Sequence, residues 1–181
     1  MYEIPQEFIA EIETYLNSPN GKLNNHDSGP TLAEVMTNIR LLPYEVNAAF
    51  DRCGRKIYEH TSHLKRSDVT AVPIAYVPHI HLLVHNHPDG HTFSAIDLCT
   101  AYNVDAAVLM VVTPIHNYTL FRPSSGWPSH KDWIEEYDDI VLMLSHNHRY
   151  NDDTRAIQHR ALSQVARHYG IKYLMTTTAT S

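Results

Sequence analysis

Two histidines that stand two residues apart, and a carboxylate ten residues after the second, form the pattern in this sequence with the most evident chemistry. His85 and His87 follow the apolar run Leu82–Val84, and Asp97 lies beyond a turn at Pro88–Gly90. Side chains two apart on a β-strand point to the same side, roughly 6.6–6.8 Å apart along the chain. Two imidazoles and a carboxylate can bind Zn²⁺ and leave one tetrahedral position for water. The spacing therefore predicts a zinc site of the type that activates water.

Ser94 begins the segment that carries the carboxylate. Ser94-Ala95-Ile96-Asp97 has the form of a capping box, which predicts a helix from Ser94 to Tyr102 with Asp97 one turn into it. The capping box is also the main alternative, because Asp97 would then bond the Ser94 N–H instead of a metal and the histidines would simply end a strand. The histidine pair, the turn and the Ser-x-x-Asp segment each favour that alternative when taken alone. Their occurrence together is much rarer and favours the metal site.

The chain holds 14 histidines, so most of them must be bystanders. Two other His-x-His pairs end at His81 and at His148. Ten residues after them come His91 and Gln158, and neither pair is followed by Ser-x-x-Asp at the matching offset. We expect both pairs to be surface or packing residues.

Composition restricts the class of protein. The 181 residues are 43% hydrophobic, which suits one globular domain with a full core. A net charge of −6 argues against a broad nucleic-acid-binding face. Two cysteines provide no disulfide framework, no apolar run approaches the ~18 residues of a membrane helix, and no signal sequence is evident. We expect a soluble, cytoplasmic protein.

Hydrophobic periodicity and turn residues divide the chain into an N-terminal helix and linker (1–30), one domain (31–175) and a flexible tail (176–181). The predicted helices are 5–16, 31–39, 94–102, 131–146 and 152–169, the last with Gly170 as its C-terminal cap; the predicted strands are 45–51, 56–61, 80–87, 106–113, 118–122 and 171–175, and 67–78 is mixed. This order indicates an α+β fold with α-β-α layers, in which helices flank a mixed, mainly antiparallel sheet.

His85-Asn86-His87-Pro88 followed by Ser94-x-x-Asp97 resembles the JAMM motif of the JAB/MPN metalloprotease superfamily. The Asn-His-Pro form is similar to bacterial RadC-like members and to JAB domains linked to phage and polymorphic-toxin proteins, although the His-to-Ser interval is one residue shorter than in RadC-like sequences. The resemblance extends more weakly over residues 31–173. It implies a cytidine deaminase-like core and one Zn²⁺ held by His85, His87 and Asp97. It also implies hydrolysis of a peptide or isopeptide bond, with ubiquitin-like conjugates among the substrates.

That family also carries a glutamate at the start of the first hairpin strand, where it acts as the base. Glu45 stands at the matching position, and Glu59, on the second hairpin strand, is the alternative base. The resemblance further implies that the Ser94 hydroxyl donates a hydrogen bond to the oxyanion.

Two other functions remain open at this point. The chain can be a JAB-fold scaffold or interaction module with a structural or vestigial metal site, although a complete ligand set argues against this. The second function is that of an HNH nuclease, because His85-Asn86-His87 spells the name of that motif. The sequence argues against it, because in that motif the named residues are spread over a ββα unit instead of being adjacent. From the JAMM resemblance we expect a protein or peptide substrate as the partner. From the composition we expect neither a membrane nor a nucleic-acid partner.

Overall fold

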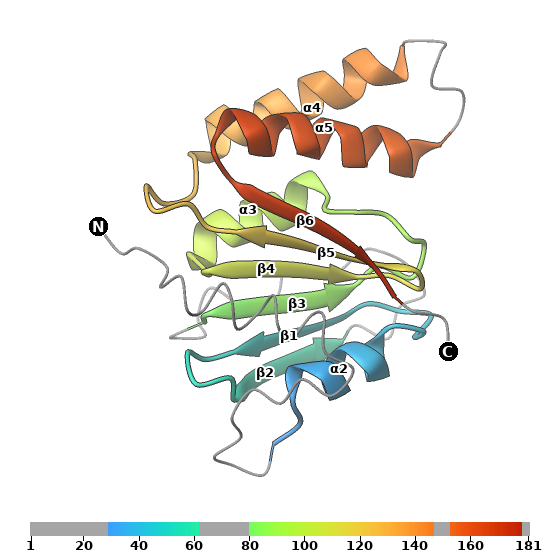
Figure 1. The fold of residues 1–181 in the computed structure, drawn as a ribbon, viewed down its shortest axis with the longest axis vertical. Coiled ribbons are helices and arrows are strands. Elements are labelled where there is room, and N and C mark those ends of the chain that lie inside the picture. The colour runs from blue at the N-terminus through green and yellow to red at the C-terminus, as the bar shows by residue number, and fades with distance from the viewer. Residues whose placement is uncertain (1–28, 62–79, 147–152, 179–181) are drawn as a thin grey trace.

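The computed structural model describes residues 29–61, 80–146 and 153–178, and the predictions for 5–16 and 67–78 fall outside these ranges. Ten elements lie within them (Figure 1). The helices are α2 (Leu32–Ile39), α3 (Ala95–Val104), α4 (His130–Ser145) and α5 (Thr154–His168); the strands are β1 (Val46–Phe50), β2 (Lys56–Thr61), β3 (Leu82–Asn86), β4 (Val108–Val112), β5 (His116–Phe121) and β6 (Lys172–Thr177).

The strands form one sheet in the order β2-β1-β3-β4-β5-β6. Strands β3 and β4 are parallel, joined by a crossover through α3, and every other neighbouring pair is antiparallel. The predicted mixed, mainly antiparallel sheet flanked by helices is therefore confirmed.

Side chains alternate between the two faces of this sheet, and each face has its own core. Helices α3, α4 and α5 cover one face, here called the α3 face, where Leu83, Leu109 and Leu120 are buried. Helix α2 covers the opposite face, the α2 face, where Ala48 and Val84 are buried (Figure 1). The result is the predicted α-β-α layering, and any strand residue can be assigned to a face from its position.

Local signals place several of these elements where the sequence predicts them. Helix α2 begins with a complete capping box between Thr31 and Glu34, and its inner side buries Leu32, Val35, Met36 and Ile39. The predicted hairpin forms with β1 and β2 on either side of a turn at residues 52–55. Strand β5 begins at His116, so the chain enters the sheet two residues before the predicted start at Tyr118.

The C-terminal segment differs from the prediction at its end. Gly170 has a φ of +65°, and the Ile171 N–H donates to Ala166 O at 2.8 Å, which is the Schellman arrangement that ends α5. Strand β6 then continues through Thr177 instead of ending at Met175, and the Thr178 N–H still donates to Ile115 O. The first two residues of the predicted tail, Thr176 and Thr177, therefore belong to β6, because their pairing with β5 extends the strand.

Candidate metal centre

Strand β3 aims both motif histidines at the same region. His85 pairs with Val111, a buried residue of the α3 face, so the imidazole of His85 lies on that face. The backbone N–H of His87 donates to Val112 O at 2.9 Å, which keeps the chain alongside β4 for one residue after β3 ends. The two rings consequently lie on the same side, and their Nε2 atoms are 3.1 Å apart.

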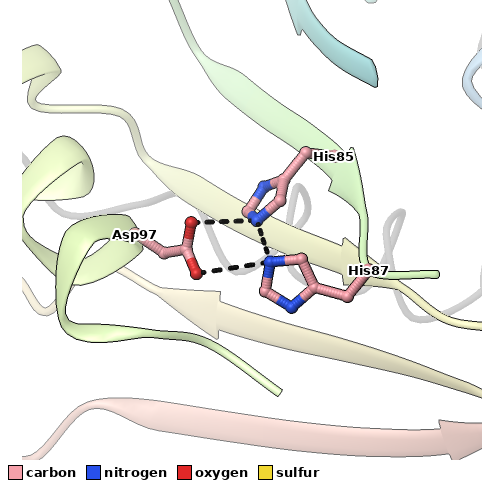
Figure 2. A group of neighbouring side chains, drawn as sticks. All are labelled: His85, His87 and Asp97. Atoms are coloured by element: carbon pink, nitrogen blue, oxygen red, sulfur yellow. Dashed lines mark hydrogen bonds and ion pairs between the residues drawn. The ribbon is translucent and has the colours of Figure 1, made fainter. Parts of the chain in front are cut away.

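Helix α3 brings the carboxylate to the histidines (Figure 2). Asp97 Oδ2 accepts the Ser94 N–H at 2.6 Å and the Ser94 hydroxyl at 2.8 Å, so the predicted capping box forms. Asp97 Oδ1 lies 3.0 Å from His85 Nε2, and Oδ2 lies 3.6 Å from His87 Nε2. The capping role and the metal-binding role, which were alternatives in the sequence, are compatible because the cap orients the carboxylate toward the rings.

The loop between β3 and α3 sets the orientation of the His87 ring. Its Nδ1 lies 3.1 Å from His91 O and 3.0 Å from Thr92 O. A ring nitrogen facing two carbonyl oxygens carries the hydrogen, which leaves the lone pair on Nε2 directed at His85 and Asp97. Gly90, with a φ of +85°, provides the turn that lets the loop fold back.

Two tyrosines from distant elements hold this loop. Tyr173 on β6 places its hydroxyl 3.2 Å from Thr92 Oγ1, and the Tyr137 hydroxyl on α4 donates to Phe93 O at 3.0 Å. Burial raises the pKa of both tyrosines, so both hydroxyl groups stay protonated. Sequence reasoning missed them, because nothing in the spacing links them to the histidine motif.

The three donor atoms have the spacing that a small cation requires. His85, His87 and Asp97 each offer one ligand atom, and these atoms lie within 4.8 Å of one another. Ligand bonds of about 2.0–2.1 Å at tetrahedral angles place donor atoms about 3.3–3.4 Å apart. The distances of 3.1 Å between the two Nε2 atoms and 3.0 Å from His85 to Asp97 are close to that value. The group could therefore hold a small metal ion.

Electrostatics also favour a cation at this point. Burial alone would raise the pKa of Asp97, but its interactions with His85 and His87 and the hydrogen bond from the Ser94 N–H hold that pKa well below its usual range. The carboxylate is thus ionised throughout the physiological range. His85 Nδ1 is buried, and no hydrogen-bond partner for it lies among the residues that the structure describes.

The structure brings only one of the two candidate bases to this centre. Glu45 directly precedes β1, is 6% exposed, and places Oε1 3.8 Å from His87 Nε2. Glu59 pairs in register with Ala48 of the α2 face, so its side chain lies on the opposite side of the sheet, where it is exposed and contacts Lys56. The alternative base at Glu59 is therefore not part of the cluster, because the strand register turns it away.

The Ser94 hydroxyl is already engaged. It donates to Asp97 Oδ2 and accepts the Asp97 N–H at 3.3 Å. It stands at the centre, as predicted, but it must turn away from Asp97 before it can donate to an oxyanion.

The other histidine pairs lie elsewhere as far as the structure describes them. His81 is half-buried at the start of β3, and His146 caps the exposed end of α4, where its Nδ1 lies 2.7 Å from Leu142 O. Their partners His79 and His148 fall outside the described residues.

Comparison with known proteins adds no assignment. No protein-family model, no curated protein and no solved structure matches this chain. Among the described residues, every helix is too short or too polar to cross a lipid bilayer. The likeness to JAB/MPN proteins therefore stands on the motif.

Proposed function

We propose that this chain is a zinc-dependent hydrolase of the JAMM type that cleaves an amide bond. One observation carries the proposal. Three side chains that can bind a metal converge in a buried cluster, and a fourth side chain, the carboxylate of Glu45, lies beside it without belonging to the ligand group. Three protein ligands with a neighbouring acid form the usual arrangement of a catalytic zinc site, whereas structural sites use four protein ligands.

Each residue has a distinct task in this proposal. His85, His87 and Asp97 would hold Zn²⁺, which when bound lowers the pKa of water toward about 7 and polarises a carbonyl. Glu45 accepts a proton from the attacking water as its oxygen bonds to the carbonyl carbon. Glu45 then returns that proton to the amide nitrogen, the carbon–nitrogen bond breaks, and a carboxylic acid and an amine leave.

Ser94 supplies the remaining polar contact. After rotation, its hydroxyl donates to the oxygen that gains negative charge, an interaction worth on the order of 3 kcal/mol in acyl transfer. The motif resemblance points to a peptide or isopeptide as the substrate, with a ubiquitin-like conjugate as one class to test.

The test combines metal analysis with a cleavage screen. Purified protein should contain one equivalent of zinc, and His87→Ala should lose it. Glu45→Gln should keep the zinc and lose cleavage of peptides and ubiquitin-like isopeptides. Glu59→Gln is the matched control, because it is the same substitution on the opposite face of the sheet, and it should behave as wild type.

Two results would contradict the proposal. Wild-type protein without bound metal would remove its basis. Zinc-loaded protein that cleaves none of these substrates would instead favour a scaffold in which the metal joins β3 to α3. Cleavage of plain peptides without isopeptides would keep the hydrolase and exclude deconjugation.

A further inference from the structure

Asn86, which stands between the two motif histidines, has no role in the proposed chemistry, yet it is fully buried. As the last residue of β3 it points to the α2 face, away from the histidine rings. Its Oδ1 accepts the Val46 N–H at 2.7 Å, and its Nδ2 donates to Tyr44 O at 3.0 Å. A backbone N–H can only donate and a backbone carbonyl can only accept, so these two partners determine which end of the amide faces which group.

The two backbone groups held by Asn86 lie on either side of Glu45. Backbone pairing between β1 and β3 begins only at Asn47 with His85, so Glu45 lies beyond the paired part of the strand. Beyond the paired part, the Asn86 side chain still joins β3 to this segment through two hydrogen bonds, one to the residue before Glu45 and one to the residue after it. Glu45 itself falls on the α3 face, where its carboxylate reaches the histidine cluster.

We propose that Asn86 is a positioning residue that holds the Glu45 carboxylate at the metal centre. The importance of that carboxylate rests on the proposed function, in which Glu45 transfers the proton. Proton transfer requires the base within hydrogen-bond reach of the water, and a displacement of about 1 Å can cost roughly 100-fold in rate. Asn86 thus links the strand that carries the histidines to the residue that carries the base.

The amide is the group that suits this position. An aspartate at 86 would lack the donor for Tyr44 O and would bury a second negative charge near Glu45. An alanine removes both bonds, and a serine is too short to replace both. A glutamine keeps both groups but moves them outward by one methylene.

A double-mutant cycle tests whether Asn86 acts through Glu45. On a peptide cleaved in the screen above, Asn86→Ala should lower kcat about 10- to 100-fold, with KM and zinc content unchanged. In the Glu45→Gln background the same change should not lower the residual rate of cleavage any further, because the group that Asn86 positions is gone. A loss in that background as large as in wild type would overturn the inference.

A matched control separates positioning from general loss of stability. Asn117 is also a buried asparagine with two side-chain bonds, to Arg40 and to Thr176, but it lies on β5 away from Glu45. Asn117→Ala should lower the unfolding temperature and leave kcat unchanged. If Asn86→Ala does not fold, Asn86→Ser serves as the second variant, with a smaller expected loss of kcat.

A crystallographic comparison does not depend on activity. In crystals of zinc-loaded Asn86→Ala, the Glu45 carboxylate should move away from the His87 ring by more than about 1 Å relative to wild type. A carboxylate that stays in place would overturn the inference even if the enzyme is active. If wild-type protein hydrolyses nothing, the proposed function fails, while this comparison still decides whether Asn86 positions Glu45.

Discussion

Asp97 uses its two carboxylate oxygens differently. Oδ2 receives both hydrogen bonds from Ser94 and thereby begins α3, while Oδ1 faces His85 at 3.0 Å. A free aspartate side chain would have to lose rotamer entropy to bind a metal, and the cap has already removed that freedom. The helix cap thus prepares Asp97 for the metal-binding role proposed for it, because hydrogen bonds that fix the orientation of a ligand tune metal affinity.

This arrangement makes a prediction for Ser94→Ala. Loss of the cap should lower the free energy of unfolding by about 1 kcal/mol, because the Asp97 N–H loses its acceptor. Loss of the Ser94 hydroxyl should also weaken zinc binding by about 10-fold, because Asp97 is then oriented only by the Ser94 N–H. Urea unfolding and competition with a chromogenic chelator measure the two effects.

Thr31→Ala provides the control at the same structural position in another helix. Thr31 forms a capping box with Glu34 at the start of α2, on the opposite side of the sheet. The variant should lose a similar amount of stability with unchanged zinc affinity. Equal zinc affinity in Ser94→Ala and wild type would show that the cap does not orient the ligand.

At the scale of elements, the β1–β2 hairpin is closed by one carboxylate. Asp51 Oδ1 accepts the N–H groups of Cys53 and Arg55, and Oδ2 pairs with Arg55 Nε at 2.9 Å. Partial burial would raise the pKa of Asp51, but the hydrogen bonds from Arg55 and Cys53 outweigh burial and lower that pKa. This turn joins the end of β1 that lies farthest from Glu45 to the start of β2.

The lowered pKa sets the sign of a pH dependence. A carboxyl group whose folded pKa lies below its unfolded value of about 3.9 stabilises the protein fully above that value, and this stability is lost as the pH falls through the folded pKa. Asp51→Asn should therefore cost about 0.5–1 kcal/mol at pH 7, and the two proteins should converge as the pH falls through the folded pKa of Asp51. Thermal unfolding as a function of pH measures this difference.

Asp139→Asn, at an exposed position on α4, is the control for general charge effects. The unfolding temperature of this variant should equal that of wild type across the same pH series. A difference between Asp51→Asn and wild type that persists at low pH would show that the asparagine disturbs the turn sterically.

At the scale of the molecule, the three proposed metal ligands come from two elements that the chain connects only through a loop. His85 and His87 belong to the end of β3, and Asp97 belongs to the first turn of α3, between the sheet and its helical layer. A ligand that binds only the folded protein stabilises it by an amount set by its concentration relative to Kd. Metal binding should therefore stabilise the whole domain.

When zinc is added back to chelator-treated protein at 100 times its Kd, the free energy of unfolding should rise by about 2.7 kcal/mol. For a chain of this length that raises the unfolding temperature by roughly 5–10 °C. Calorimetry of protein treated with a chelator, with and without added zinc, measures the shift. His87→Ala should show none. An equal shift in His87→Ala would place the zinc elsewhere in the chain.

Interactions between near neighbours in the chain could be read from the sequence. The capping boxes at Thr31 and Ser94, the hairpin turn and the shared side of His85 and His87 all depend on residues within a few positions of one another. Such patterns follow from helix and strand periodicity, which holds wherever the element lies. For this reason the cluster of His85, His87 and Asp97 could be predicted before the structure.

Contacts between distant segments were decided by the tertiary structure. The choice of Glu45 over Glu59 depends on which face of the sheet each residue occupies, and that follows from the register between β1 and β2. The contacts of Asn86 with Tyr44 and Val46 join positions about 40 residues apart. Periodicity cannot specify such contacts, because they depend on how the strands are ordered and aligned. The grouping of His85, His87 and Asp97 is thus encoded locally, whereas the approach of Glu45 to that group and the contacts of Asn86 depend on the assembled sheet.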